Sequence, residues 1–425
     1  MRENDGDRGL TRRAYLASGG AVVASGALAG CSTESGPASE GNGTDDTTSA
    51  AGESQTSESG GADGSETTDG ARSETESSAD GPYTVSMAPM GEVEFERVPT
   101  SIFTRLTHHA GMAFALGRGN DVNAMHAPDW YDAIWNLFTP RLPGVELDWS
   151  GLYSSWQVDK EHLYELDSDV HLADPASVDA LENWDESDID EIAENVGPWF
   201  GNSLSARHQD PPEAWADRYE YYTLWEQFET VAEVFQERER YEALASIRDD
   251  MVATIEGNLP PESERPTVTM AGTSDLESIY VYKVNVPGFL ASHTRPFGLV
   301  DAFGDDVASG AAVDMEAMVA ADPDAIIVMG GMHPERPMSA TRQAIEDHPV
   351  GGDLSAVQND RVYAQAARYQ GPILNLFQTE MTAKQLFPEQ FGEWPLYDTG
   401  PYPELSSEEQ LFDHQRVADI INGEF

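Results

Sequence analysis

The stretch VDKEHLYELDSDVHL, residues 158–172, decides the fold because it recurs without gaps as VDMEAMVAADPDAII at residues 313–327. Val, Asp, Glu, Asp and Asp are identical at five of the fifteen positions. Each copy predicts a short helix, a turn with the pattern Asp-x-Asp and then an apolar strand. A repeat whose copies lie this far apart is typical of a duplicated domain rather than of a solenoid. The sequence therefore predicts two related α/β lobes.

The region before the first copy has the pattern of a strand, a helix and a second strand. Residues 101–106 predict a buried strand, residues 109–116 are apolar at helical spacing, and residues 122–125 predict another strand. This order is typical of a βαβ unit with parallel strands. We therefore expect an α/β fold of two Rossmann-like lobes with central, mostly parallel sheets.

Between the two copies, residues 211–257 predict one long connecting helix. The segment begins with two prolines, ends at a glycine, and carries apolar residues mostly at helical spacing in between. A helix of about 45 residues would be about 65 Å long, enough to join two lobes as a spine. The apolar stripe lapses at residues 236–239, where a kink or break is expected. The alternative is two stacked helices within one lobe.

The N-terminal 31 residues have the pattern of an export signal. Arg12 and Arg13 form a twin-arginine start, and residues 17–30 are small, weakly apolar and too few for a permanent membrane helix. The segment ends in Leu-Ala-Gly-Cys at Cys31, which resembles the lipobox of exported lipoproteins. We expect export by the twin-arginine route and lipid attachment at Cys31, on the outer face of the cell membrane. The alternative is an incidental cysteine in a cleaved peptide.

Composition divides the rest of the chain. Residues 32–80 contain no aromatic residue and predict a disordered acidic tether. We expect an N-terminal lobe at 81–210, the connecting helix at 211–257, a C-terminal lobe at 258–390, and a C-terminal extension with a helix at 391–425.

The chain is strongly acidic, with 24 Lys and Arg against 76 Asp and Glu and a net charge of -52. The tether carries twelve acids and one arginine, so most of the excess, -42, belongs to residues 81–425. Such a surface repels itself in dilute buffer and stays soluble when salt screens it, which favours a salt-adapted protein. Nucleic acid and anionic membrane surfaces are poor partners for it.

Three short motifs resemble those of one family, the substrate-binding proteins of ABC importers for ferric siderophores, cobalamin and haem. Residues 99–125 resemble its opening strand, helix and turn, and residues 315–328 resemble its E-x-L-x-x-x-x-PD-x-I-x-V element. Residues 356–363, AVQNDRVY, resemble its late strand entry. The resemblance spans residues 95–390, whereas residues 126–157, 176–212 and 391–425 depart from the usual pattern.

This resemblance implies a class III periplasmic-binding fold and a binding function. It implies a lipid-anchored extracellular receptor of salt-adapted archaeal type that captures an iron(III) siderophore between its lobes. The partners would be an ABC permease and its ATPase, with the receptor a monomer without cofactor. Cobalamin, haem and a bare metal ion are alternative ligands, and delivery to another type of receptor is an alternative route.

In such a fold the ligand lies beside the carboxyl ends of the parallel strands. A bulky chelate rich in oxygen atoms suits arginine donors and aromatic covers. The candidate ligand-binding residues are Arg105, His108, His109, Trp130, Tyr131, Tyr153, Trp156, Lys283, His293, Arg295, Arg368 and Tyr369. The arginines could instead pair with surface carboxylates, the aromatic residues could belong to the core, and the two adjacent histidines could be structural.

Glu161 and Glu316 occupy equivalent positions in the two copies of the repeat. The resemblance implies that these two glutamates dock onto arginines of the permease, one from each lobe. The alternative is that both are ordinary solvated helix residues.

We expect no direct metal ligand, although histidines 108, 171, 293 and 333 could converge as a bare-metal site. A secreted enzyme is the competing class. The chain has no Gly-x-Ser-x-Gly, His-Glu-x-x-His or phosphate-loop pattern, and its only cysteine is Cys31. We therefore expect a binding protein and not an enzyme.

Overall fold

The computed structural model describes residues 81–206, 209–273 and 275–425. The predicted export signal with Cys31 and the predicted tether, residues 32–80, lie outside these residues. No helix among the described residues combines the length and the apolar character needed to cross a bilayer.

The elements of the first part of the described chain are β1 (Tyr83–Met87), β2 (Gly91–Phe95), β3 (Ile102–Thr104), α2 (Thr107–Ala115), η1 (Gly119–Asp121), β4 (Val122–Met125), α3 (Pro128–Trp135), η2 (Thr139–Arg141), β5 (Tyr153–Ser154), η3 (Ser155–Gln157), α4 (Lys160–Leu166), β6 (Val170–Leu172), α5 (Pro175–Asp179), α6 (Glu186–Asn195), η4 (Leu204–Ala206), α7 (Glu213–Ala216), α8 (Leu224–Val234) and α9 (Arg238–Asn258). The second part contains η5 (Glu262–Glu264), β7 (Thr267–Gly272), β8 (Ile279–Tyr282), η6 (Arg295–Phe297), β9 (Val300–Asp301), β10 (Ala311–Val313), α10 (Met315–Ala321), β11 (Ala325–Val328), α11 (Met338–Glu346), η7 (Gly351–Asp353), α12 (Ser355–Gln358), β12 (Val362–Ala364), α13 (Pro372–Leu386), α14 (Pro388–Phe391) and α15 (His414–Asn422).

The first lobe is built on a parallel sheet with strand order β5-β4-β3-β6. The three residues of β3 and the three of β6 are all buried, as expected of parallel strands covered on both faces. The predicted strand–helix–strand unit is present as β3, α2 and β4. An antiparallel hairpin of β1 and β2 precedes it.

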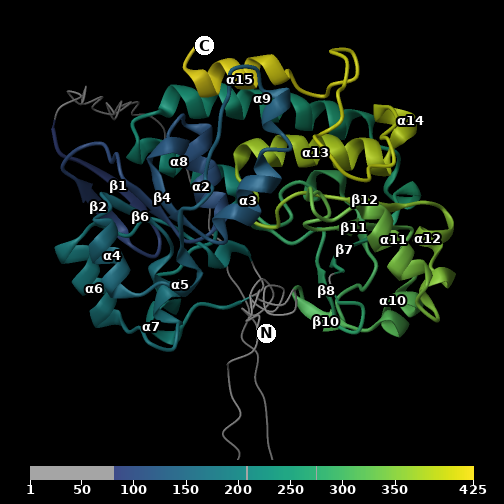
Figure 1. Cartoon of the computed structure of the whole chain (residues 1–425), viewed down its shortest axis with the longest axis horizontal. Coiled ribbons are helices and arrows are strands. Elements are labelled where there is room, and N and C mark those ends of the chain that lie inside the picture. The colour runs from purple at the N-terminus through teal and green to yellow at the C-terminus, as the bar shows by residue number, and fades with distance from the viewer. Residues whose placement is uncertain (1–80, 207–208, 274) are drawn as a thin grey trace, which may run out of the picture. The chain divides into compact units, whose positions relative to one another are not determined.

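The second lobe has a mixed sheet with strand order β10-β8-β7-β11-β12, and β9 also pairs with β7. The pairs β7–β11 and β11–β12 are parallel, whereas β8 runs antiparallel to both of its neighbours. Figure 1 shows the two sheets as the centres of separate lobes. The predicted α/β fold with two lobes is confirmed.

Both copies of the repeat form the same local structure. Asp159 caps α4 by accepting from the His162 amide at 3.0 Å, and Asp314 caps α10 by accepting from the Ala317 amide at 2.8 Å. Each helix has seven residues and ends at an aspartate in the left-handed region. The shared aspartates of the repeat therefore mark the start and the end of each helix.

The last shared aspartate anchors each lobe's first sheet strand. The carboxylate of Asp169 accepts hydrogen bonds from the amides of Thr100 and Ser101, just before β3. The carboxylate of Asp324 accepts from the amide and hydroxyl of Thr267, the first residue of β7, both at 2.8 Å. In both lobes the strand after the turn then pairs in parallel with the anchored strand. The two lobes thus repeat a contact as well as a sequence.

The structure corrects the expected extent of the connecting helix. Residues 211–257 form three helices, α7, α8 and α9, of which α9 is the longest with 21 residues. Thr223 begins α8 with a capping box, and Gln236 interrupts the chain before α9 with a φ of 55°. The second interruption falls where the apolar stripe lapses. Helix α9 joins the lobes, because Arg240 donates to the Leu116 carbonyl at 2.7 Å and a later part of α9 packs on η6.

The two lobes also meet where the middle of α2 packs against the start of α13. A Cβ on Gly111 would lie 2.7 Å from the Cα of Gly371, so neither helix could carry a side chain at this contact. The hydroxyl of Thr107, the first residue of α2, donates to the carbonyl of Tyr369, three residues before α13, at 2.7 Å. This close approach fixes the distance between the segments that follow β3 and β12.

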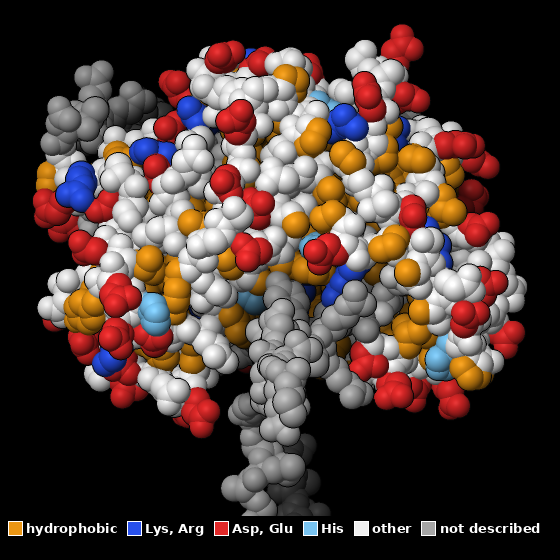
Figure 2. All heavy atoms as spheres, viewed as in Figure 1, with side chains coloured by type: hydrophobic (Ala, Val, Ile, Leu, Met, Phe, Trp, Pro, Cys, Tyr) orange, Lys and Arg blue, Asp and Glu red, His pale blue; other side chains and the backbone are white. Residues whose placement is uncertain are grey.

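The segment after α13 packs back onto both lobes. Glu380 of α13 is fully buried, and its carboxylate accepts from the Tyr402 hydroxyl and the Leu411 amide, each at 2.5 Å. The Nε2 atom of His414, at the start of α15, lies 3.2 Å from the same carboxylate. Figure 1 shows α15 next to α9, above α13. Figure 2 shows carboxylates over much of the visible face of the described residues and few basic groups.

Candidate functional site

The first candidate side chain, Arg105, directly follows β3. It is 5% exposed, and its Nη1 atom donates to the Ser177 hydroxyl at 2.8 Å. Its Cζ atom lies 5.4 Å from the centre of the Trp156 ring. Burial lowers the pKa of Arg105, although a guanidinium remains charged at any physiological pH. A buried positive charge therefore stands at the carboxyl end of the central strand of the first lobe.

His126 follows the neighbouring strand β4 and is 7% exposed. Its ring centre lies 4.4 Å from that of Trp156 and 5.6 Å from that of Tyr131. Burial, and then the charges of Arg105 and Arg368, lower the pKa of His126 to about 4. The imidazole is consequently neutral near pH 7, with one ring nitrogen able to accept a hydrogen bond or bind a metal.

Arg368 approaches the same place from the second lobe, after β12. Its Cζ atom lies 4.6 Å from the centre of the Tyr282 ring and 4.8 Å from that of Tyr369. Burial works to lower the pKa of Arg368, but the phenol groups of Tyr369, Tyr282 and Tyr131 raise it on balance. Because Tyr131 belongs to the first lobe, these charges and rings form one site.

We call this set the interlobe cluster. It consists of Arg105, His126, Tyr131, Trp156, Tyr282, Arg368 and Tyr369. Its members come from segments after β3, β4, β5 and β12 and from the end of β8. The cluster combines two guanidinium groups, one neutral imidazole and a shell of aromatic rings. These groups can bind an oxygen-rich anion while covering its organic surface.

A second contact crosses between the lobes beside the cluster. The Trp130 ring of α3 stacks on the His333 ring, with centres 3.5 Å apart and planes at 11°. The Cζ atom of Arg336 lies 4.5 Å from the centre of the Trp130 ring. We call this group the Trp130 stack. Because it joins α3 to the loop after β11, the stack holds the two lobes together at this point.

His108 lies at the start of α2, where the two lobes touch. Its ring stacks on Phe289 of the second lobe, with centres 4.3 Å apart, and its centre is 6.2 Å from that of Tyr369. Burial, and next the adjacent His109, lower the pKa of His108 well below its usual value. Neither ring is exposed. His108 therefore borders the interlobe cluster as a neutral packing group, and burial likewise lowers the pKa of His109 to about 3.

Two predicted residues point away from the cluster. The Tyr153 ring stacks on His162 of α4, with centres 4.5 Å apart. The Lys283 ammonium lies 3.1 Å from the Asp301 carboxylate and also donates to the Gly304 carbonyl. The structure thus places both side chains on their own lobe.

His293 and Arg295 lie inside the second lobe and near α9. Gln370 donates through Nε2 to Nδ1 of His293 at 2.7 Å, and burial lowers the pKa of His293 to about 3. Arg295 donates to the Gly288 carbonyl at 3.4 Å. Burial, and then repulsion from Arg248 of α9, lower the pKa of Arg295. Both residues support the second lobe rather than join the interlobe cluster.

The cluster and the contacts beside it contain residues that the sequence analysis did not choose. His126 belongs to the cluster, and His333, Arg336 and Phe289 make the contacts beside it. His126 was detectable, because it is the first residue after a predicted strand. His333 was considered only as part of a metal site. No group of three or more His, Cys, Asp or Glu placed to hold a metal ion occurs among the described residues.

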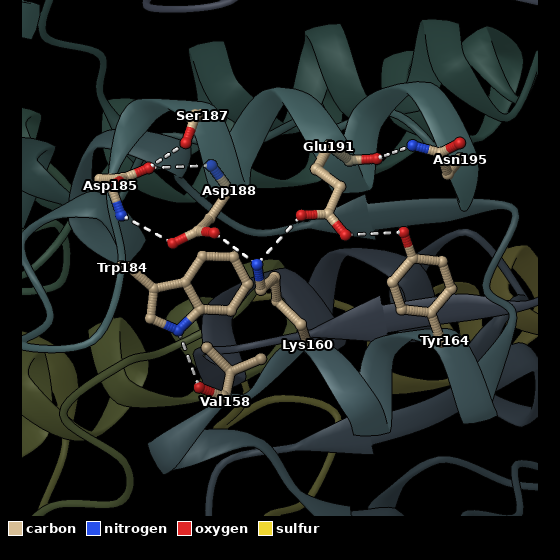
Figure 3. A network of polar contacts seen from close by, with 9 residues as sticks. All are labelled: Val158, Lys160, Tyr164, Trp184, Asp185, Ser187, Asp188, Glu191 and Asn195. Atoms are coloured by element: carbon tan, nitrogen blue, oxygen red, sulfur yellow. Dashed lines mark hydrogen bonds and ion pairs between the residues drawn. The ribbon is translucent and has the colours of Figure 1, made fainter.

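Glu161 and Glu316 are exposed at the same position in the first turns of α4 and α10. Figure 3 shows how α4 is held: the Lys160 ammonium lies between two carboxylates of α6, 2.5 Å from Asp188 and 3.0 Å from Glu191. These contacts, with Asp188 first, raise the pKa of Lys160. The residue next to Glu161 is thus fixed to a second helix.

The chain was compared with protein families, solved structures and curated protein sequences. A family model described as "Periplasmic binding protein" matches residues 136–369. The structure of a periplasmic binding protein from Veillonella parvula is similar with a TM-score of 0.52 and 14% identity, covering 72% of this chain and 97% of that chain. Comparison with curated protein sequences gives no significant match.

Two further solved structures have somewhat lower similarity. One is titled an ABC-type Fe3+-hydroxamate transport system from Saccharomonospora viridis, with 19% identity, a TM-score of 0.49, and coverage of 72% of this chain and 99% of that chain. The other is a petrobactin-binding protein from Bacillus subtilis, with 14% identity, a TM-score of 0.49 and the same coverages.

The family match spans more than half of the chain. It includes both copies of the repeat, the connecting helix α9, and the segments that carry Trp156, Tyr282 and Arg368. The likeness to the Veillonella protein supports the same fold. The chain therefore belongs to the periplasmic binding protein family.

Proposed function

We propose that this protein is an extracellular solute-binding receptor that captures an iron(III) siderophore between its lobes and delivers it to an ABC permease with its ATPase. The interlobe cluster carries this proposal. Arg105 and Arg368, from different lobes, both act on the pKa of His126 at one place. Family membership supports solute binding, and a location outside the cytoplasm, without a catalytic role.

The chemistry of the cluster favours a chelate with several oxygen atoms. Guanidinium groups donate to such oxygens in fixed geometry, and their charge suits a ligand with negative charge. The rings of Tyr131, Trp156 and Tyr369 offer apolar faces to its organic shell. In a chain with 24 Lys and Arg among 425 residues, a buried Arg105 and a partly buried Arg368 at one interlobe site are a specific feature.

Haem or cobalamin is the second candidate, and His126 is the observation that favours it. Its pKa of about 4 leaves the imidazole unprotonated, which is the form that binds iron or cobalt. A bare metal ion is a third candidate on the same ground. A binding assay separates these ligands directly.

Titration of the full chain decides between them. Tryptophan fluorescence is followed in about 2 M KCl, where salt screens the acidic surface, with a ferric hydroxamate, a ferric catecholate, cobalamin, haem and an iron(III) salt. We expect quenching by a ferric chelate. Arg105→Ala and Arg368→Ala should each weaken binding by about 10-fold to 100-fold, the usual loss for a hydrogen bond to a charged group.

Arg361→Ala is the matched control. Arg361 precedes β12, whereas Arg368 follows this strand, and Nη2 of Arg361 donates to the Leu386 carbonyl. It should bind as the wild type does. Tight binding of cobalamin or haem without any binding of ferric chelates would reject the siderophore. Equal folding and binding in dilute buffer would reject the proposed salt adaptation.

We also propose how the receptor is held and how it docks. Lipid attachment at Cys31 would anchor a monomer to the membrane surface, and mass spectrometry of the membrane-bound chain would detect the lipid. A Cys31→Ala chain found still in the membrane fraction would speak against this anchor. Glu161 and Glu316 would contact the permease, and their placement on equivalent helices supports a pair of matching contacts.

A further inference from the structure

The segment after α14 connects the two elements that carry the Trp130 stack. This segment includes residues 397–402, with the sequence YDTGPY, which we call the strap. On the second lobe, the amide of Ser339 donates to the Asp398 carboxylate at 2.7 Å, and the amide of Met338 donates to the Asp398 carbonyl at 2.9 Å. The Thr399 hydroxyl donates to the Pro334 carbonyl at 3.4 Å. Pro334 directly follows His333 of the stack.

The other end of the strap is bound to the first lobe. The amide of Tyr402 donates to the Leu137 carbonyl, and Nε of Arg141 donates to the Tyr402 carbonyl, both at 2.8 Å. Leu137 lies two residues beyond α3, which carries Trp130. The Tyr402 ring is fully buried and packs on Phe138, with ring centres 5.5 Å apart.

The strap therefore holds both sides of one interlobe contact. One end fixes the loop that carries His333 and Arg336, and the other end fixes the segment that follows Trp130. Four of its bonds to the lobes use the backbone of the strap, the fourth being from Nη2 of Arg342 to the Tyr397 carbonyl at 2.9 Å. The Asp398 carboxylate, at the first turn of α11, and the Thr399 hydroxyl add one side-chain bond each. The strap thus connects the two segments that carry the rings of Trp130 and His333.

We propose that Asp398 is a positioning residue for ligand retention, because it holds the loop that carries His333 and so keeps the Trp130 stack closed beside the interlobe cluster. Arg105 and Tyr369 of the cluster are buried, each 5% exposed, and Tyr131, Trp156 and Arg368 are partly buried. A ligand leaves only when the contacts between the lobes open. The proposal rests on the proposed function, because that function places the ligand at the interlobe cluster. Whether Asp398 holds the loop that carries His333 can be measured without any ligand.

The first measurement is hydrogen–deuterium exchange of the full, ligand-free chain. Asp398→Ala should speed exchange in residues 333–339 by about threefold to tenfold, the effect of one hydrogen bond on a local equilibrium. Asp398→Asn keeps an acceptor oxygen and should restore protection. Asp413→Ala is the matched control, because Asp413 lies in the same C-terminal region, is exposed, and caps α15 by accepting from the Arg416 amide.

The second measurement is the release rate of a ferric hydroxamate, followed by tryptophan fluorescence after mixing with excess competitor protein. Asp398→Ala should speed release by about threefold to tenfold, and Arg141→Ala, at the other end of the strap, should act in the same direction. In a His333→Ala background Asp398→Ala should have almost no further effect, since the two residues act through one contact.

Several results would overturn the proposal. These are an unchanged release rate in Asp398→Ala, an equal change in Asp413→Ala, or a full effect of Asp398→Ala in the His333→Ala background. If the wild type binds no ferric chelate, the proposed function fails instead, and exchange in residues 333–339 still decides whether Asp398 holds the loop.

Discussion

At the residue scale, neutral histidines are buried throughout the first lobe and at the interlobe site. His171 of β6 is an example that lies away from the cluster. Its ring packs against Phe103 and Trp199, and its Nδ1 atom lies 2.9 Å from the Gly197 carbonyl. Burial lowers the pKa of His171 to about 4, against the usual value of 6.5. The folded protein therefore excludes a proton that the unfolded chain accepts.

This difference predicts a loss of stability in mild acid. Between about pH 6.5 and pH 4 the unfolded chain binds more protons at this position than the folded chain, so the unfolding free energy falls as the pH falls. We expect His171→Asn to reduce the slope by about 1.4 kcal/mol per pH unit within this interval. Denaturant unfolding of both chains at several pH values measures it.

The same series separates packing from titration. At about pH 7.5 the imidazole is neutral in both states, so the difference between the two chains there reports only the lost contacts. Parallel stability curves for His171→Asn and the wild type across the acidic interval would show that the ring does not contribute to the pH dependence.

Some residues of the candidate site were predictable from strand ends, and others were not. Arg105 and Arg368 follow buried strands, so position alone selected them. Tyr282 and Lys283 are neighbours, and adjacent residues of a strand point to opposite faces. An error of one residue in the expected register therefore exchanges the faces on which Tyr282 and Lys283 lie. Only the structure shows that Tyr282 contacts Arg368 while Lys283 pairs with Asp301.

At the element scale, the two helices of the repeat end in the same way but with different support. Asp167 after α4 has a φ of 44°, and Asp322 after α10 has a φ of 40°. The Asp322 carboxylate accepts from the amide and hydroxyl of Ser355 at 2.8 and 2.9 Å. Among the described residues, the Asp167 carboxylate has no hydrogen-bond or ion-pair partner.

Glycine at these two positions should therefore have opposite effects. Glycine adopts the left-handed region without strain, so Asp167→Gly should raise the unfolding free energy by about 0.5 kcal/mol. Asp322→Gly gains the same relief but loses two hydrogen bonds, so it should lower the unfolding free energy by about 1 kcal/mol. Denaturant unfolding measures both. Changes of the same sign in the two variants would contradict this account of the helix ends.

The elements themselves were largely predictable, because the period of apolar residues distinguishes helix from strand within each copy. The division of residues 211–257 into three helices was only partly predictable. The break before α9 coincides with a lapse in the apolar stripe, but the earlier break at residues 217–223 retains tyrosines at positions that also suit a helix. There the Thr223 capping box starts a new helix, and local capping overrides the period.

At the scale of the whole molecule, the duplicated lobes present two equivalent glutamates, Glu161 and Glu316. We expect Glu161→Arg combined with Glu316→Arg to abolish uptake of the iron chelate by cells, because like charges would then face the permease. Binding of the chelate to the purified receptor should not change, since both side chains are exposed and belong to α4 and α10 rather than to the cluster.

Glu165→Arg combined with Ala320→Arg is the control, because it places the same charges on exposed positions elsewhere on these two helices. It should keep more uptake than the first pair. Normal uptake by the Glu161 and Glu316 variant would remove these residues from the docking surface.

Glu380 also has a consequence for the order in which the protein is made. Its partners Tyr402, Leu411 and His414 are synthesised after α13 and leave the ribosome later. An unsatisfied carboxylate inside a protein is strongly destabilising, so α13 cannot reach its final packing while those residues are still being added. Both lobes therefore complete their folding only once translation has passed His414. A chain cut short between Glu380 and Tyr402 would be a substrate for degradation rather than a smaller receptor.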